Sequence, residues 1–284
     1  MMIESVNPHL KDIIGRVEKQ PELLNLLYQP EKIEIKLSDL RKRSSEFYKL
    51  ETKNKSSSQR DVFWVKIVKN KSSDQIAVTL NRQYKDFKSF FNFLVTYNQK
   101  ESSQAAKYFC CEPIIVIEKN NAIITKDCSG IKFDIYLKTH IPFLSSKNII
   151  RHCQNLGYLL MLFHNHFKVQ NVLPSEFKKY KDIFFETYKT CPHPNMDAIT
   201  QCHRDYQPRN LFVGKGFVEV IDFVGFKKGF SEEDIIFFCR YIYKAKFNLL
   251  YSKFFKKKMI KSFLNGYGIN DSSLYTFVIK TILQ

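Results

Sequence analysis

One segment, from His203 to Phe223, constrains the fold of this chain more than any other: it reads HRDYQPRNLFVGKGFVEVIDF. Within it, residues 211–213 form a short apolar run, residues 214–216 are rich in glycine, and residues 217–221 alternate as a strand does. Two short strands separated by a glycine-rich reversal are typical of a β-hairpin. We therefore predict a tight hairpin in this segment.

This hairpin would bring an amide and a carboxylate together at one end. If the turn pairs Val213 with Phe217, Asn210 lies opposite Val220, and Asp222 is its diagonal neighbour across the ladder at about 7 Å. An amide oxygen and a carboxylate at that separation can hold a hard cation, and Mg²⁺ takes only one or two protein carboxylates besides water and phosphate oxygens. We therefore predict that Asn210 and Asp222 bind Mg²⁺.

A second carboxylate precedes the hairpin. Asp205 comes shortly before Asn210, on a loop that Pro208 keeps from forming a helix. A carboxylate near a metal-bound γ-phosphate can accept the proton of an attacking hydroxyl group. We expect Asp205 to be such a base, and His203 to support the loop from beneath.

These residues resemble the aminoglycoside phosphotransferase and choline kinase group, whose loop reads HGD, then Asn after four further residues, then a strand ending in Ile-Asp-Phe or Ile-Asp-Trp. The resemblance implies that Asp205 is the catalytic base and that Asn210 and Asp222 bind magnesium. The literal HRD is that of protein kinases. However, protein kinases place a lysine two residues after the base, where this chain has Gln207, and a glycine where it has Val224.

The resemblance implies an α+β, two-lobed protein kinase-like fold, with a small antiparallel β-sheet N-lobe containing one helix and a larger, mainly helical C-lobe. We place the N-lobe, which ends in the hinge, at residues 1–130, and the C-lobe, with the catalytic loop and metal site, at residues 131–284. The family also carries an Asp-Leu-Ala stretch that opens a helix supporting the catalytic loop. SEEDIIFFCRYI matches it, with Ser231 as a helix cap and Asp234 at the aspartate position, although a well-capped amphipathic helix would read the same way.

A lysine is expected on the third of three antiparallel strands within residues 31–69. Lys66, in FWVKIV, stands where the family has its phosphate-binding lysine, and Lys69 is the close alternative. The next helix, predicted from Val78 to Leu94, matches the one that carries the glutamate partner of this lysine.

This chain has Gln83 where the family often has that glutamate. Gln83 can orient an ammonium group but cannot neutralise it. Asp86 lies on the same side of the helix and is the alternative partner.

The phosphate-covering loop also departs from a glycine-rich pattern, because the only glycine before Ser129 is Gly15. The turn LRKRSSEFYKLE resembles the serine-bearing loops of the family, so Ser44 and Ser45 are candidates for phosphate contacts. An ordinary polar turn fits equally well. The resemblance places adenine against backbone groups of the hinge, near residues 127–130.

Composition is that of a globular cytoplasmic enzyme. Apolar stretches are far shorter than the 18 or more residues of a membrane-spanning helix, the start lacks the regions of a signal peptide, and seven cysteines without paired CxxC spacing indicate free thiols.

The net charge of +17 implies attraction to polyanions. In KFFKKKMIKSFLNGYG, apolar residues recur at helical spacing, so this helix is a candidate for contact with anionic lipid, with a solvated face as the alternative. The residues are Phe255, Met259 and Phe263, and Lys253, Lys256, Lys257, Lys258 and Lys261.

We therefore expect an ATP- and Mg²⁺-dependent kinase that phosphorylates a hydroxyl group of a sugar or glycan acceptor, lipid-linked or anionic, at or near the inner face of the membrane. Choline, another amino alcohol or a small free sugar is the alternative acceptor. A degenerate kinase fold that only binds its ligands is a second alternative, suggested by Gln83 and the absent glycine loop. Nucleic-acid binding is suggested by charge alone, without a recognised motif. The acceptor, the choice of ATP or GTP and the oligomeric state stay open.

Overall fold

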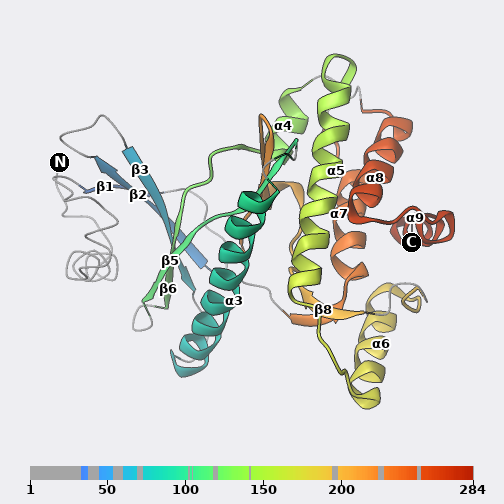
Figure 1. Ribbon diagram of the computed structural model, residues 1–284, viewed down its shortest axis with the longest axis horizontal. Helices are drawn as coiled ribbons and strands as arrows, with labels where there is room; N and C mark the ends of the chain where they lie inside the picture. The colour runs from blue at the N-terminus through green and yellow to red at the C-terminus, as the bar shows by residue number, and fades with distance from the viewer. Residues whose placement is uncertain are drawn as a thin grey trace. The chain divides into compact units, whose positions relative to one another are not determined.

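The chain is mixed α and β with several small sheets, as drawn in Figure 1 from a computed structural model. It divides into two compact units, one of Met1–Phe91 with Cys111–Cys128 and the other of Asn92–Cys110 with Ser129–Gln284. The structure describes residues 33–37, 45–53, 60–68, 73–101, 103, 105–117, 121–140, 142–193, 198–222, 227–247 and 251–283.

The first unit contains a five-stranded sheet in the order β1-β2-β3-β6-β5, with every neighbouring pair antiparallel. The three strands predicted within residues 31–69 are confirmed. In the third, Phe63, Val65 and Ile67 are buried while the alternate residues are half-buried, as the two-residue period of a strand requires. The strands are β1 (Ile33–Leu37), β2 (Ser45–Lys53), β3 (Arg60–Val68), β5 (Pro113–Ile117) and β6 (Ala122–Lys126).

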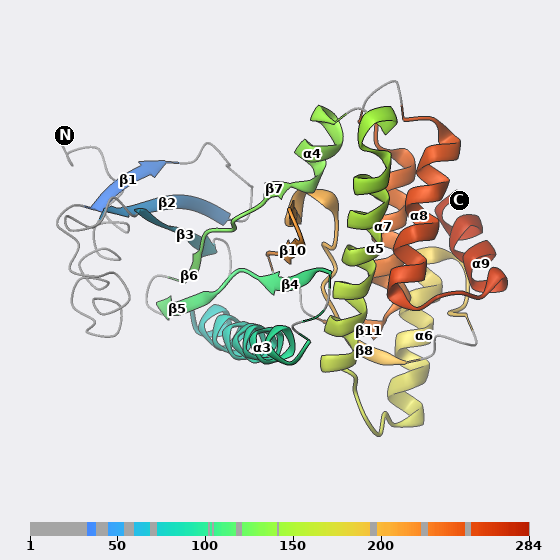
Figure 2. The same ribbon diagram turned by 45° about the horizontal axis from the view of Figure 1, so that its top comes forward.

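Helix α3 (Ser73–Lys100) is longer at both ends than the predicted helix. Figures 1 and 2 show it beside β5, where the Tyr84 hydroxyl donates to the carbonyl of Ile114 at 3.0 Å. Its last turns belong to the second unit, and there the Tyr97 hydroxyl lies 2.7 Å from that of Tyr158. The contact of Tyr97 stabilises the last turns of α3, where polar residues obscure the helical pattern of the sequence.

The second unit carries the hairpin and six helices among its described residues. Its four-stranded sheet has the order β4-β10-β9-β7, in which β4 and β10 are parallel, and a two-stranded sheet joins β11 to β8. The strands are β4 (Lys107–Cys110), β7 (Ile131–Lys132), β8 (Ile199–Cys202), β9 (Leu211–Gly214), β10 (Phe217–Val220) and β11 (Lys227–Phe230). The helices are α4 (Phe133–Thr139), α5 (Pro142–His166), α6 (Pro174–Tyr188), α7 (Glu232–Lys244), α8 (Lys253–Tyr267) and α9 (Ser272–Leu283).

Helices α5 and α8 pack against each other in both views of the fold (Figures 1 and 2). Glycines allow the backbones to come close: a Cβ atom built at Gly157 would lie 2.0 Å from the carbonyl oxygen of Phe263, and one at Gly266 would lie 1.9 Å from that of Gln154. The Ser262 hydroxyl also donates to the carbonyl of Ile150 at 2.9 Å. The core of this unit therefore depends on small residues at the crossing.

Helix α8 is amphipathic, as predicted, but one of its lysines is half-buried. Met259 and Phe263 are buried, whereas the ammonium group of Lys256 donates to the carbonyls of Tyr243 and Ala245 at the end of α7. Burial lowers the pKa of Lys256. The ammonium group of this lysine thus satisfies free carbonyls at a helix C-terminus.

All seven cysteines are free thiols; five are buried, as predicted, whereas Cys128 is partly exposed and Cys191 is exposed. Within the ranges that the structure describes, no helix has the length and apolar character needed to cross a membrane.

Candidate active site

The hairpin predicted from the sequence is confirmed, but its register differs by one residue. Gly214 pairs with Phe217 and Leu211 with Val220, so the turn contains only Lys215 and Gly216. Gly216 has a φ of 79°, which glycine adopts without the steric cost that other residues incur. The predicted pairing of Val213 with Phe217, with three residues in the turn, was wrong.

This shorter turn changes how the two predicted metal ligands are placed. The ladder extends past the strands, because the N–H of Ile221 donates to the carbonyl of Asn210 at 3.0 Å. Asn210 therefore lies opposite Ile221, and Asp222 is the next residue along. Asp222 has a φ of 67°, so the chain turns sharply where the strand ends.

Asn210 is tied directly to Asp205. Its Nδ2 donates to the Asp205 backbone carbonyl at 2.9 Å and to Oδ2 of the same residue at 2.7 Å. Pro208 begins a single 3-10 turn, Pro208–Asn210, that folds the chain back far enough for these contacts. Because both partners of Nδ2 are acceptors, Asn210 Oδ1 must face the other way, and no described residue donates a hydrogen bond to it.

The residues at the end of the hairpin fit a hard divalent cation. Asn210 Oδ1 is a neutral oxygen that the hydrogen bonds to Asp205 direct away from the base, and Asp222 supplies a carboxylate on the opposite strand, one residue after Ile221, which pairs with Asn210. Oxygen ligands of these two types suit Mg²⁺ or Ca²⁺. In the described ranges, no three His, Cys, Asp or Glu side chains gather closely enough to hold a metal among themselves.

His203 contacts both the loop of Asp205 and the end of the strand. Its Nε2 lies 2.9 Å from the carbonyl oxygen of Ile221, and its Nδ1 lies 3.3 Å from the backbone nitrogen of Asp205. A carbonyl only accepts and an amide only donates, so the proton is on Nε2 and Nδ1 is an acceptor. The imidazole thus fixes the loop that carries Asp205 relative to the strand that leads to Asp222.

Asp234, at the start of α7, is fully buried beneath this loop. Its Oδ2 accepts from the N–H of His203 at 2.7 Å and its Oδ1 from the N–H of Arg204 at 2.6 Å. Nε2 of His164, on α5, lies 3.0 Å from the same Oδ2. Burial raises the pKa of Asp234, but the hydrogen bond and charge of His164, together with the backbone hydrogen bond from His203, outweigh burial and hold this pKa below its ordinary value.

Two residues of this network, His164 and Tyr267, were not predicted as part of the site. His164 Nδ1 lies 2.8 Å from the hydroxyl of Tyr267. Ser231 precedes α7 as expected, but its side chain makes no capping hydrogen bond, so that prediction was wrong. The only sequence signal for His164 is a polar side chain within the strongly apolar helix α5.

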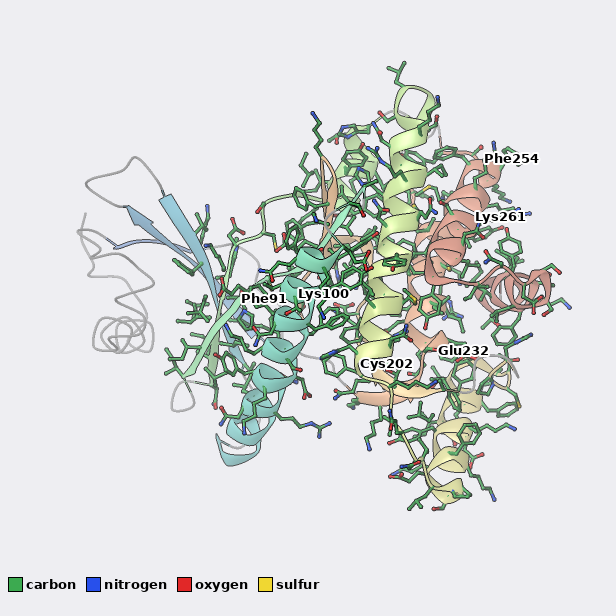
Figure 3. All side chains as sticks on the ribbon, viewed as in Figure 1. Phe91, Lys100, Cys202, Glu232, Phe254 and Lys261 are labelled. Atoms are coloured by element: carbon green, nitrogen blue, oxygen red, sulfur yellow. The ribbon has the colours of Figure 1, made fainter. Side chains whose placement is uncertain are left out.

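The loop therefore begins at the end of β8, where Figure 3 labels Cys202, and is held from α5, α7 and α8. No protein-family model and no curated protein matches the sequence. Solved structures do match. A choline kinase from Cryptosporidium parvum Iowa II superposes with a TM-score of 0.55 at 13% identity, covering 96% of this chain and 85% of that chain. An amicoumacin kinase in complex with AMP-PNP, Ca²⁺ and Ami superposes with a TM-score of 0.50 at 12% identity, covering 96% and 86%.

The chain has the fold of these kinases. The resemblance to the aminoglycoside phosphotransferase and choline kinase group is thus confirmed at the level of the fold. At this identity the residues of the loop, and not the overall similarity, must support any statement about chemistry.

In the first unit of this kinase-like fold, Lys66 lies in the middle of β3, in register with Phe47 of β2 and Ile123 of β6. Gln83 is buried on α3. Asp86, the alternative partner for the lysine, forms an ion pair with Arg82 at 3.9 Å. The roles of Lys66 and Gln83 therefore stay predictions.

The remaining predicted positions fall at the limits of what the structure describes. Ser45 begins β2 opposite Val68, but its side chain lies outside the described part, as do Ser44 and Lys69. At the predicted hinge, the indole of Trp64 donates to Asp127 at 2.7 Å. This contact anchors the end of the first unit's sheet.

Proposed function

We propose that this chain is an ATP- and Mg²⁺-dependent phosphotransferase of the aminoglycoside phosphotransferase and choline kinase group. The observation that carries the proposal is the pair of hydrogen bonds from Asn210 Nδ2 to Asp205. They set a carboxylate on one side of the amide and an oxygen ligand on the other. A base and a metal ligand in fixed relation are what phosphoryl transfer to a hydroxyl group requires.

In the proposed reaction, the acceptor oxygen bonds to the γ-phosphorus while the bond from that phosphorus to the bridging oxygen breaks, and ADP leaves with its electrons. The acceptor proton moves to a carboxylate oxygen of Asp205. Asn210 and Asp222 would hold Mg²⁺, which supplies positive charge to the phosphate oxygens when bound. His203 and Asp234 keep the loop in place during this exchange.

The finer arrangement is also part of the proposal. We assign residues 1–130 to an N-lobe that covers the nucleotide and residues 131–284 to a C-lobe that carries the loop. Lys66, oriented by Gln83, would contact the α- and β-phosphates, and Ser44 and Ser45 would donate to phosphate oxygens. The fold of a kinase that holds AMP-PNP and Ca²⁺ supports nucleotide and metal use.

For the acceptor, we propose a hydroxyl group of a sugar or glycan, lipid-linked or anionic. The net charge of +17 favours an acceptor or surroundings with negative charge. One structural neighbour is a choline kinase, so choline or another amino alcohol is the second candidate, followed by a small free sugar.

We also propose that the protein works in the cytoplasm, in peripheral contact with an anionic membrane surface through α8. The helix has no acidic residue, and Phe254 is 68% exposed with the ammonium group of Lys258 at 4.8 Å from its ring centroid. In Figure 3, Phe254 and Lys261 lie on the side of α8 away from α5. A basic face with an exposed aromatic ring suits an anionic lipid surface.

The test is transfer of labelled γ-phosphate from Mg²⁺-ATP to a panel of glycans, amino alcohols and sugars. With an acceptor found, Asp205→Ala should lower kcat by about 10²- to 10⁴-fold, the usual contribution of a general base. Asp182→Ala, which removes an exposed carboxylate on α6, is the matched control and should keep full activity. Unchanged turnover in Asp205→Ala would reject the assigned base.

A degenerate fold that binds nucleotide without transfer is the second candidate, because Gln83, buried on α3, brings no charge to the predicted lysine. Thermal stabilisation of the wild-type protein by Mg²⁺-ATP, with no transfer to any acceptor in the panel, would favour this candidate over the enzyme.

A further inference from the structure

Arg209 contacts the proposed base, Asp205. Its Nη2 lies 3.2 Å from Oδ1 and 3.3 Å from Oδ2 of Asp205, one turn away along the chain. The two side chains are 51% and 26% exposed. Arg209 therefore contacts both carboxylate oxygens while about half of its side chain stays exposed to solvent.

Two uncharged donors complete the surroundings of this carboxylate. The Gln207 side-chain amide donates to Oδ1, and Asn210 donates to Oδ2. Of the donors that the described part of the loop directs at Asp205, Arg209 alone carries a charge. The base is thus held by three side chains of its own turn, one of them cationic.

The rest of the Arg209 guanidinium group is available to a ligand. The group has five N–H donors in one plane, and Nη2 supplies only two of them. Nη1 and Nε make no hydrogen bond to any residue that the structure describes. A planar edge with free donors beside an anionic partner is the geometry in which arginine binds phosphate oxygens.

The free edge of the Arg209 guanidinium group can offset the negative charges that meet at the loop during phosphoryl transfer. A carboxylate base and a γ-phosphate are both negative and repel each other, and a cation between them offsets this repulsion. Protein kinases place a lysine two residues after the base, where this chain has the neutral Gln207. The other arginine of the loop, Arg204, is paired with Glu233 at 3.0 Å.

We propose that Arg209 provides the missing cation: one edge of its guanidinium group holds Asp205, and the other binds the non-bridging oxygens of the γ-phosphate. This inference rests on the proposed function. It makes Arg209 a residue that contacts the transferring group itself, and it identifies the terminal phosphate of a nucleoside triphosphate as the ligand.

The test compares a nucleotide that has a γ-phosphate with one that lacks it, and it needs no acceptor. Dissociation constants of Mg²⁺-AMP-PNP and Mg²⁺-ADP are measured by calorimetry for wild type, Arg209→Gln and Arg209→Lys. Lys215→Gln, which removes an exposed charge from the hairpin turn, is the matched control. Melting temperatures report whether each variant is folded.

Arg209→Gln should weaken binding of Mg²⁺-AMP-PNP about tenfold, the effect of one lost charge-assisted contact, and change binding of Mg²⁺-ADP less than about twofold. Arg209→Lys, which keeps the charge but not the planar edge, should fall between wild type and Arg209→Gln. Lys215→Gln should bind both nucleotides as wild type does.

Equal changes for the two nucleotides, or no change for either, would overturn the role of Arg209 while leaving the proposed function intact. A wild-type protein that binds neither nucleotide would overturn the proposed function, and the role of Arg209 with it. A fall in melting temperature of Arg209→Gln alone, without selective loss of Mg²⁺-AMP-PNP binding, would show that the arginine only stabilises the loop.

Discussion

At the scale of single residues, the loop depends on a buried carboxylate that takes no part in the proposed chemistry. Asp234 accepts hydrogen bonds from the N–H groups of His203 and Arg204, and from His164. The hydrogen bonds from His203 and His164 are buried and the one from Arg204 is partly buried, so a lost acceptor leaves these donors unsatisfied. Asp234 therefore connects the stability of the second unit to the geometry of the loop.

Replacing Asp234 by Asn should lower the free energy of unfolding by about 3 to 5 kcal/mol, because the new amide group points donors at donors and the negative charge is lost. Urea denaturation at pH 7 measures the loss, and Asp182→Asn on the exposed face of α6 is the control. A difference below about 0.5 kcal/mol, the usual range of surface substitutions, would contradict the role of Asp234.

The same variant has a predictable pH dependence. The folded state holds the pKa of Asp234 below its ordinary value, so the carboxylate stabilises the protein above the unfolded pKa of about 3.9. This stabilisation is lost as the pH falls through that value toward the lower folded pKa. The gap between wild type and Asp234→Asn should thus narrow below about pH 4.

Single residues also show what the sequence could predict of the site. The spacing of Asp205, Asn210 and Asp222 along the chain predicted the loop and the hairpin, because both are formed by residues that are close together in sequence. The register could not be read from Gly-Lys-Gly, since either glycine can serve the turn. A Cβ atom at Gly214 would lie 2.1 Å from the Phe217 ring, so this glycine is a strand residue covered by its cross-strand partner.

At the scale of elements, the crossing of α5 and α8 places Tyr267, at the end of α8, next to His164 on α5. Gly266→Ala should destabilise the protein by about 1 to 3 kcal/mol, because the added methyl group meets the backbone carbonyl of Gln154. Helix propensity alone predicts the opposite sign, since alanine favours a helix over glycine by about 1 kcal/mol. The direction of the change therefore tests the packing.

Thermal unfolding followed by circular dichroism measures this effect. Lys261→Ala, at an exposed position of the same helix, controls for general effects of alanine in α8 and should leave the midpoint nearly unchanged. A higher melting temperature for Gly266→Ala would show that the two backbones do not approach as closely as the structure indicates.

The elements that the sequence predicted are those with strong local patterns. Strands β1, β2 and β3, helix α3 and the hairpin all follow apolar periodicity, whereas their ends depend on partners such as Tyr158. Strand β4 was not singled out, because it is short and pairs with β10, which is distant in sequence. Its position is fixed by Asn98, whose side chain bonds both the N–H and the carbonyl of Tyr108.

At the scale of the whole molecule, the lysines of some helices are balanced by acidic residues of the same helix and those of others are not. Helix α6 carries exposed lysines among three acidic residues, whereas the lysines of α8 have no acidic neighbour in their helix. Charge that is locally balanced contributes little attraction to a polyanion, and unbalanced charge contributes most. The two helices thus offer a matched comparison within one protein.

The triple variant Lys257→Gln, Lys258→Gln, Lys261→Gln should reduce partitioning onto phosphatidylserine-containing vesicles by about 100-fold, since each lysine near such a surface contributes about 1 kcal/mol. The control is the α6 triple, Lys178→Gln, Lys179→Gln, Lys181→Gln, which loses equal charge. Vesicle co-sedimentation at two salt concentrations measures both. Equal binding by the two triples would remove the case for α8 as the membrane contact.

Two residues of the loop and strand, Arg204 and Asp222, have left-handed backbones, with φ values of 60° and 67°. Such a conformation costs an L-amino acid about 1 kcal/mol relative to its preferred one. A short peptide with this sequence would relax away from it, since the contacts from α5, α7 and α8 would be missing. The reactive shape thus belongs to the folded unit, and copying the motif into another scaffold would not reproduce it.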